Sequence, residues 1–268
     1  YAMGAKPHTC MAVVTVPPGS HAQVHDTLQQ LMLGAAQIMA EAGCTLVGGH
    51  TGEGQELALG FSVQGLLPAN AQGQLQQAWP KSGLQTGQAL ILTKPLGTGV
   101  IMAAAPTGQA QGRWVDAALA TMQVGHAAAV PILQAHGATA CTDVTGFGLL
   151  GHAAEMARAS GKALTLDLAS LPLLDGALAL SQAGVRSTLY PANLAQRTVL
   201  DDPDAAAQHP CFPLLFDPQT TGGLLAAVSP EQADACVAQL RQAGHAQAAV
   251  VGVGGASGPA SISLHAFT

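Results

Sequence analysis

The sequence predicts a fold of mixed α-helix and β-strand in two parts, of the α/β or α+β class. Expected strands and helices alternate along the chain without a regular period, and no internal repeat is present. A polar, turn-rich stretch at 68–87 divides the chain and is the best candidate for a domain boundary. With 268 residues, 49% of them hydrophobic, the chain is long enough for two ordinary domains.

The amino-terminal part is expected to follow a β-α-β-β order. An apolar, β-branched run at 9–17 ends in two prolines and predicts a strand. Apolar residues recur at helical spacing over 21–42, so we expect an amphipathic helix that ends near Gly43. A short strand at 44–50 runs into two glycines, and a further strand covers 56–67.

The second part restarts with a strand and a glycine-rich turn at 88–100. The other expected elements are helical patterns around 113–135 and 148–160, an apolar strand at 136–141, a strand at 162–172 that leaves into a loop, a helix at 173–183, a turn and strand at 216–230, a helix at 231–244, and strands at 246–255 and 261–267.

Composition and charge exclude several classes of protein. The formal net charge is -6, and the nine Lys and Arg form no basic run, which argues against nucleic-acid binding. The five cysteines form no CxxC pair or cluster, so we expect no disulfide framework and a reducing, cytoplasmic compartment. No apolar stretch of about 18 residues suggests a membrane span. Charged residues are only 9%, which suggests that a partner, another subunit or a missing part covers some surface.

Asp143 is the first candidate for chemistry, in the stretch "CTDVTGFGLLGH". A carboxylate between a strand and a flexible turn can reach Mg²⁺, which is usually held by one or two carboxylates and the phosphates of a nucleotide. Gly146 and Gly148 would let backbone N–H groups approach anionic oxygens near a helix N-terminus. Alternatively, Asp143 and Thr145 merely cap the following helix, which composition alone favours.

Three further glycine turns are candidates for phosphate contacts. At 46–54, Gly48 and Gly49 could expose backbone donors, with His50 and Thr51 adding side-chain donors; the alternative is an ordinary hairpin turn. At 92–100, Lys94 could neutralise phosphate charge or be a solvated lysine. At 217–225, Asp217 and Pro218 begin a turn for which a structural role is preferred.

Several familiar motifs are absent. The sequence has no Walker loop, no GxGxxG after a strand, no HExxH and no GxSxG. His152 lies on the helix after Asp143, where core or cap packing is expected. Cys10, Cys44 and Cys141 lie in apolar strands and are expected to be core residues.

Taken in order, five motifs resemble one family. They are "YAMGAKP", "AGCTLVGGHT", "LILTKPLGTGV", "TDVTGFGLLGHAAEM" and "DPQTTGGLL", and they span essentially the whole chain. The series resembles the selenophosphate synthetase (selenide, water dikinase) family, and its GGH and TTGG turns are shared with aminoimidazole ribonucleotide synthetase and thiamine-monophosphate kinase. The resemblance implies the two-part aminoimidazole ribonucleotide synthetase-like fold. Residues 1–70 would be the remainder of an amino-terminal α/β domain for ATP binding and dimerisation, and residues 71–268 a complete carboxy-terminal α+β domain.

The resemblance also implies an activity. The family transfers the γ-phosphoryl group of ATP to selenide, giving selenophosphate, AMP and phosphate, and requires Mg²⁺. By matching motif, Asp143 would be a metal ligand, and Gly48, Gly49, His50 and Thr51 would touch ATP, with Lys94 a neighbour of the phosphates. Nucleotide would bind between the two parts, and the protein would be a cytoplasmic homodimer.

The chain also departs from the family pattern. The reactive Cys (or selenocysteine), its partner Lys and two further metal-binding Asp are expected upstream of Tyr1, so the chain is expected to be truncated within its amino-terminal half. The sequence is also similar to those members of the family that are fused behind an oxidoreductase. A non-catalytic nucleotide-binding module, or an enzyme of the same superfamily with another acceptor, are the alternatives.

Overall fold

The computed structural model describes residues 1–69 and 73–265. It divides the chain into two compact units: the first is Tyr1 with Ala5–Ala78, and the second is Ala2–Gly4 with Trp79–Thr268. The division between Ala78 and Trp79 lies inside the polar stretch 68–87. The roles assigned above to residues 1–70 and 71–268 stay predictions.

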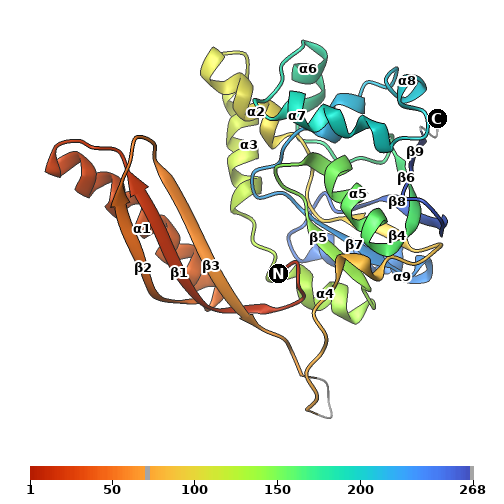
Figure 1. Cartoon of the computed structure of the whole chain (residues 1–268), viewed down its shortest axis with the longest axis horizontal. Coiled ribbons are helices and arrows are strands. Elements are labelled where there is room, and N and C mark those ends of the chain that lie inside the picture. Colours follow the sequence, from red (N-terminus) through yellow and green to blue (C-terminus); the bar gives the residue numbers. More distant parts are fainter. Residues whose placement is uncertain (70–72, 266–268) are drawn as a thin grey trace. The chain divides into compact units, whose positions relative to one another are not determined.

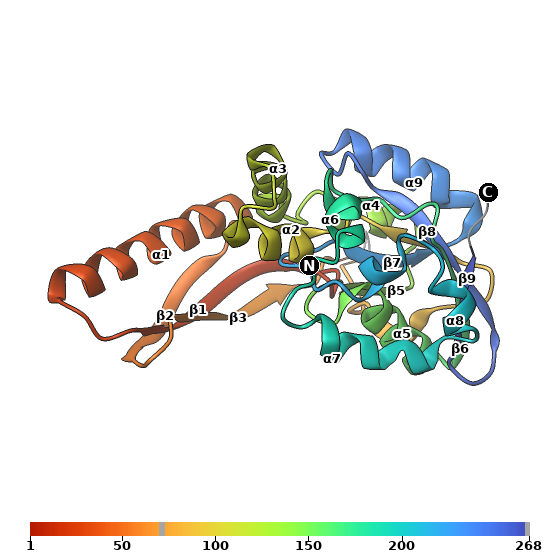
Figure 2. The ribbon, with the colours of Figure 1, turned by 90° about the horizontal axis from the view of Figure 1, so that it is seen from above.

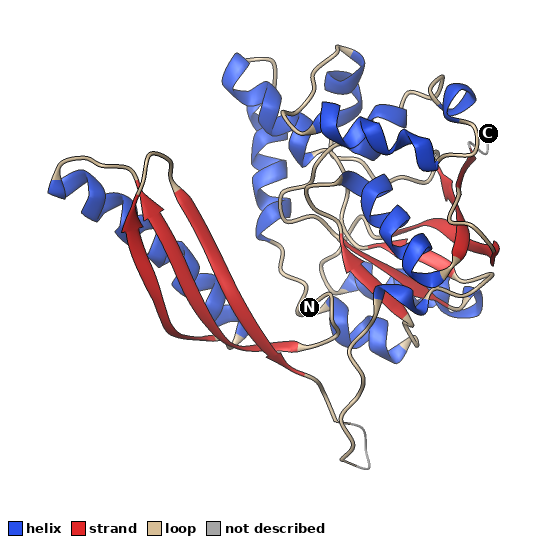
Figure 3. Ribbon diagram, viewed as in Figure 1, coloured by secondary structure: helices blue, strands red, loops and turns tan. Residues whose placement is uncertain are grey.

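The first unit is a three-stranded sheet with one helix (Figures 1 and 3). It comprises β1 (Lys6–Val16), α1 (His21–Ala42), β2 (Thr45–Glu53) and β3 (Ala58–Leu66). The strand order is β2-β1-β3, with β1 parallel to β2 and antiparallel to β3. Alternate residues of β1 are buried, and α1 packs against β1 and β2. The expected β-α-β-β order is therefore confirmed.

Helix α1 begins and ends where the sequence predicts. Ser20 is its N-cap and forms a capping box with Gln23, whose side chain accepts a hydrogen bond from the Ser20 backbone N–H at 3.0 Å. Gly43 ends the helix in the left-handed region, with φ +64°. These local signals explain why the prediction of a helix over 21–42 is confirmed.

The predicted turn at Gly48 and Gly49 is wrong, because β2 continues through both glycines to Glu53. The pairing of β1 with β2 shifts by one residue here, with Cys10 opposite Leu46 and Met11 opposite Gly48. A Cβ atom on Gly49 would lie 2.1 Å from the carbonyl oxygen of Ala12. The glycine is needed where the two backbones approach at the bulge, and no turn is required to explain it. The hairpin alternative is wrong as well, since β1 lies between β2 and β3.

The second unit is built on a sheet of order β5-β7-β4-β8-β6-β9, antiparallel except between β6 and β9. Its strands are β4 (Ala89–Leu92), β5 (Ala140–Asp143), β6 (Lys162–Asp167), β7 (Leu224–Val228), β8 (Ala249–Ser257) and β9 (Ile262–His265). Its helices are α2 (Thr98–Ala104), α3 (Gly112–Gln123), α4 (Ala129–Ala135), α5 (Gly148–Ser160), α6 (Ala177–Gln182), α7 (Tyr190–Leu194), α8 (Pro203–Ala206) and α9 (Pro230–Gln242). Short 3₁₀ turns include η1 (Lys81–Gly83) and η4 (Phe212–Phe216). This sheet agrees with the predicted α+β class.

Helices cover both faces of this sheet. Figure 2 shows α5 and α9 on opposite sides of it, and every residue of β4 and β7 is buried. Leu90 and Leu92 of β4 pack in one cluster with Leu149 and Leu150 of α5, all fully buried. Each such leucine contributes roughly 1.5–3 kcal/mol by leaving water. The packed sheet provides a firm base for the loops at its edges.

Several predicted boundaries differ from the structure. The helical pattern at 113–135 is broken between α3 and α4, where Val124 is extended and Gly125 follows. The helix expected at 173–183 begins only at Ala177, after Gly176 at φ +83°. Helices α7 and α8 were not predicted; each is short and has a proline in its first turn. Residues 266 and 267 of the last expected strand lie outside the described residues.

Two broad expectations can be checked against the fold. All five cysteines are free thiols; Cys10 and Cys141 are buried, whereas Cys44 is half-buried. Within the described part of the chain, no helix combines the length and the apolar character needed to cross a membrane.

Candidate functional site

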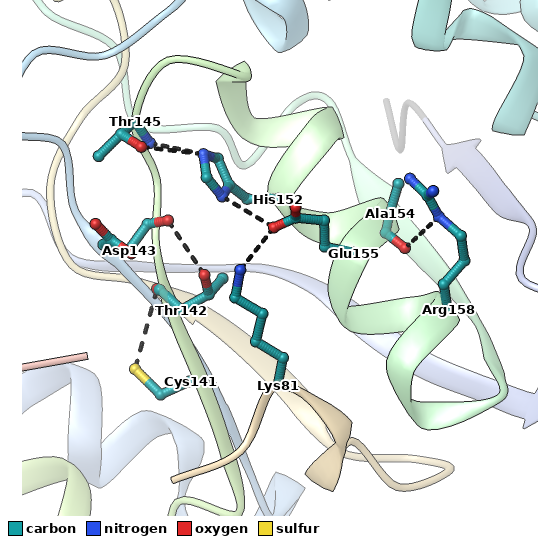
Figure 4. A network of polar contacts seen from close by, with 9 residues as sticks. All are labelled: Lys81, Cys141, Thr142, Asp143, Thr145, His152, Ala154, Glu155 and Arg158. Carbon is teal, nitrogen blue, oxygen red and sulfur yellow. Dashed lines mark hydrogen bonds and ion pairs between the residues drawn. The ribbon is translucent and has the colours of Figure 1, made fainter. Parts of the chain in front are cut away.

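Asp143 is the last residue of β5 and is exposed, whereas the three residues before it are buried. Hydrogen bonds to β7 fix this strand, with Asp143 opposite Leu224. Among the described residues, none forms a hydrogen bond or an ion pair with the Asp143 carboxylate (Figure 4). The strand therefore ends in a carboxylate whose oxygens are open to a ligand.

Buried side chains hold the turn that follows Asp143. His152 of α5 is 5% exposed, and its Nε2 accepts a hydrogen bond from the backbone N–H of Thr145 at 3.0 Å. Asn193 of α7 donates from Nδ2 to the carbonyl oxygens of Gly146, at 2.8 Å, and Phe216, at 3.0 Å. Asn193 is also 5% exposed, and no local signal in the sequence indicated its role. The turn at 144–147 is thus tied to two helices.

Helix α5 begins at Gly148 without a side-chain cap. The alternative that Asp143 and Thr145 cap it is therefore wrong, and His152 instead accepts a hydrogen bond from the Thr145 N–H in the turn before the helix. Gly148 has φ +70°, and a Cβ atom there would lie 2.7 Å from the carbonyl oxygen of Leu215. Its N–H donates to the carbonyl oxygen of Thr145 at 3.1 Å. Gly148 therefore serves close packing and the turn. Its own N–H is used within the turn and does not take the anion-binding role that the sequence analysis expected near this glycine.

A network of polar contacts lies next to the turn and includes His152, Glu155 and Lys81 (Figure 4). Burial lowers the pKa of His152, so the imidazole is neutral and the accepting Nε2 places its proton on Nδ1. That Nδ1 lies 3.6 Å from Oε2 of Glu155, which accepts a hydrogen bond from Nζ of Lys81 at 2.7 Å. The expected packing role of His152 is confirmed, and it orients the segment that carries Asp143.

The turn at 217–225 locks onto the turn at 92–100. The Asp217 carboxylate accepts a hydrogen bond from the N–H of Val100 at 3.1 Å, and Oε1 of Gln219 accepts from the N–H groups of Gly97 and Thr98 at 3.0 and 3.2 Å. Both side chains are 3% exposed, and burial raises the pKa of Asp217 to about 6. These amides are thus satisfied within the protein, which agrees with the preferred structural role for 217–225.

Lys94 is 2% exposed, so the alternative of a solvated lysine is wrong. Its Nζ donates to the carbonyl oxygen of Thr221 at 2.9 Å, and burial lowers its pKa to about 8. Thr221 is held at φ +50°, the only described residue other than glycine in that region. The ammonium group is therefore anchored beneath the TTGG turn.

Lys94 and Asp143 lie at the same edge of the sheet, on either side of the TTGG turn. A Cβ atom on Gly223 would lie 2.6 Å from the Lys94 nitrogen, and one on Gly222 would lie 2.0 Å from the Val144 carbonyl oxygen. The Val144 N–H donates to the carbonyl oxygen of Gly223 at 2.8 Å. The two glycines thus let the turn fit between the ends of β4 and β5.

Gly48, Gly49, His50 and Thr51 belong to the first unit and are exposed on β2. His50 stands opposite Val13 of β1, on the face of the sheet away from the buried Ala12 and Val14. Lys94 and Asp143 belong to the second unit. Contacts of any of these residues with ATP stay a prediction.

Comparison with known proteins shows the family and the fold of the chain. The model for the AIR synthase related protein, N-terminal domain, matches residues 1–67, and that for its C-terminal domain matches residues 85–264. The structure of hydrogenase maturation protein HypE in complex with ATP has a TM-score of 0.71 at 16% identity, covering 98% of this chain and 72% of that one. This likeness shows the shared fold.

Relatives found by sequence identify the family, whereas the solved structures show only the fold. A selenide, water dikinase of Geobacter metallireducens is 40% identical over 257 residues, which are 94% of this chain and 71% of that protein. A selenide, water dikinase of Pelobacter propionicus is 40% identical over 254 residues, covering 94% and 70%. With both AIR synthase-related domains matched and this degree of identity, the chain belongs to the selenide, water dikinase family.

Proposed function

We propose that this chain is part of a catalytic unit that transfers one phosphoryl group of ATP to selenide and a second to water, giving selenophosphate, AMP and phosphate. The observation that carries the proposal is the exposed Asp143 carboxylate, at the end of a buried strand and before a turn fixed by His152 and Asn193. The curated relatives bear the name of this reaction. Their names favour selenide over another acceptor and an enzyme over a non-catalytic nucleotide-binding module.

Asp143 is proposed to hold Mg²⁺. Within the described residues, no group of three or more His, Cys, Asp or Glu side chains could hold a metal ion. A single free carboxylate nevertheless fits Mg²⁺, which keeps several water ligands and takes others from nucleotide phosphates. When bound, the ion neutralises phosphate charge. The protein contributes a carboxylate in a fixed position, which suits a reaction that depends on positioning and electrostatics.

Gly48, Gly49, His50 and Thr51 are proposed to contact ATP, with Lys94 adding positive charge near the phosphates. Exposure of the four residues on β2 supports the first proposal. For Lys94, the support is an ammonium held by one carbonyl oxygen at the same sheet edge as Asp143.

A homodimer in the cytoplasm is proposed as the working form. Its support is the face of the first sheet away from α1, where Met11 and Val13 are 44% and 56% exposed although they lie in mid-strand. Light scattering at several concentrations tests the dimer, and a monomer at every concentration would contradict it.

Calorimetric titration with a non-hydrolysable ATP analogue tests the metal role. We expect weak binding by this chain that Mg²⁺ strengthens, and we expect Asp143→Asn to abolish the gain from Mg²⁺. Asp234→Asn changes another exposed carboxylate, on α9, and is the matched control that should keep that gain. Full retention of the gain in Asp143→Asn would overturn the assignment of Asp143.

A further inference from the structure

A small pocket lies on the side of Lys94 toward α3 and α9. Its volume is about 100 Å³, and its lining includes Thr93, Lys94, Thr121 and His245. A pocket of this size has room for several waters or for one small tetrahedral oxyanion. Pockets for drug-sized ligands start at roughly 300 Å³, so a whole nucleotide does not fit.

Lys94 and His245 line this pocket, and no acidic residue is among its lining residues. Lys94 and His245 are 2% and 3% exposed, and the ring of His126 stacks on that of His245 with centroids 6.2 Å apart. Lys94 lowers the pKa of both histidines, after the larger effect of burial, which places the three groups within electrostatic reach of one another. Among the described residues, no carboxylate forms an ion pair with Lys94. Lys94 is therefore the one charged side chain among the residues that line the pocket, and none of the described carboxylates pairs with it.

Part of this cluster has a structural explanation. Lys94 donates to the carbonyl oxygen of Thr221, and His126 donates to the backbone of Gly222, so both hold the TTGG turn. An ammonium group has three N–H donors, however, and the Thr221 contact uses one of them. At pH 7 most Lys94 side chains remain protonated, because the pKa is about 8. The contact that holds the turn therefore leaves other N–H donors of the buried Lys94 ammonium without an acceptor among the described residues.

His245 is not explained by the turn. Both of its ring nitrogens are buried, and within the described structure neither meets the geometry of a hydrogen bond, although the Thr93 backbone lies close enough to offset part of the lowering of the ring's pKa by burial. Burying polar atoms without partners is costly, and native proteins usually satisfy them with protein groups, water or an ion. A neutral imidazole can donate one N–H to an anion, as can the ammonium of Lys94 and the hydroxyl of Thr93.

We propose that the pocket lined by Lys94, His245 and Thr93 binds a small inorganic oxyanion of the size of phosphate. One bound oxyanion would accept hydrogen bonds both from the remaining N–H donors of Lys94 and from the ring N–H of His245. It does not depend on the proposed function, because it requires neither Mg²⁺ nor nucleotide. The same chemistry could be supplied by the terminal phosphate of ATP, but the pocket volume favours the free ion.

Calorimetric titration of the full chain with inorganic phosphate, at constant ionic strength and without Mg²⁺, tests the proposal. We expect saturable binding at one site, weakened at least about tenfold by Lys94→Met and several-fold by His245→Leu. Lys162→Met is the matched control. Lys162 lies at the start of β6, where its Nζ donates to Ser257, and the variant should bind phosphate as the wild type does. Absence of saturable binding in the wild type would overturn the proposal, as would unchanged affinity in both pocket variants.

A second readout covers the case in which Lys94→Met does not fold. Two-dimensional ¹H–¹⁵N spectra of the histidine rings should show the His245 resonances shifting with phosphate, at the concentrations that saturate the calorimetric signal. Resonances of the exposed His21 and His25 serve as internal controls and should stay in place. If ATP without Mg²⁺ shifts the His245 resonances in the same way as phosphate does, a nucleotide phosphate enters the pocket and the free-ion proposal is wrong.

Discussion

Nε2 of His152 accepts a hydrogen bond from the backbone N–H of Thr145, 3.0 Å away and two residues beyond Asp143. A buried imidazole thereby fixes the backbone next to the exposed carboxylate at the end of β5. The proposed metal ligand and its support come from one continuous segment, in which the strand supplies the carboxylate and the helix secures the turn.

Replacing His152 tests this support. We expect His152→Leu to leave the Thr145 N–H without its acceptor, lowering the free energy of unfolding by roughly 1–3 kcal/mol and weakening the Mg²⁺-dependent part of ATP binding. His152→Gln keeps an acceptor and should recover part of both. Chemical denaturation and calorimetry measure the two effects. Unchanged Mg²⁺ dependence in a folded His152→Leu protein would show that the contact serves stability alone.

The two glycines at the ends of α5 separate backbone strain from close contact. Gly148 and Gly161 both have left-handed φ values, +70° and +60°, but only Gly148 meets neighbouring backbone within 4 Å. We expect Gly161→Ala to cost about 1–2 kcal/mol from the left-handed conformation. Gly148→Ala should cost more, by about 1–3 kcal/mol for the overlap with Leu215. Urea denaturation compares them, and equal losses would contradict the packing role of Gly148.

Asp217 should make stability depend on pH. Its pKa is raised by burial from 3.8 to about 6, so the folded protein binds more protons than the unfolded chain between these values. The contribution of Asp217 to the free energy of unfolding is therefore fully present below pH 3.8 and is lost as pH rises through 6.

The variant Asp217→Asn removes this titration. The unfolding free energy of the wild type, relative to the variant, should rise by about 2 kcal/mol between about pH 7.5 and about pH 4.5. Other groups, including the buried histidines, titrate in both proteins and cancel in the difference. A difference that does not vary with pH would mean that Asp217 keeps an ordinary pKa.

Local signals account for what the sequence predicted well. The capping box at Ser20 and the glycine at 43 define α1, and the change from apolar residues to Asp143 and glycines marks the end of β5. These features depend on residues within a few positions of one another. A capping residue and a run of buried side chains can therefore be identified without knowing the rest of the fold.

The features that could not be predicted from the sequence depend on packing between residues that are distant along the chain. Lys94 looks like a solvated lysine until Thr221 is placed beside it, and the GTGV amides look free until Asp217 and Gln219 accept their hydrogen bonds. Gly49 belongs to a strand because its missing Cβ admits the backbone of Ala12. In each case the partner is distant in sequence, and a glycine or a lone charge carries no signal of it.

Phosphoryl transfer to selenide at a site that requires Asp143 is tested most directly by anaerobic ³¹P NMR of ATP, Mg²⁺ and selenide. The measurement uses this chain alone and the chain joined behind the upstream segment that the family resemblance predicts. We expect selenophosphate and AMP from the extended wild type, little turnover from the chain alone, and none from extended Asp143→Asn. No selenophosphate from the extended wild type, or an equal yield from Asp143→Asn, would contradict the account.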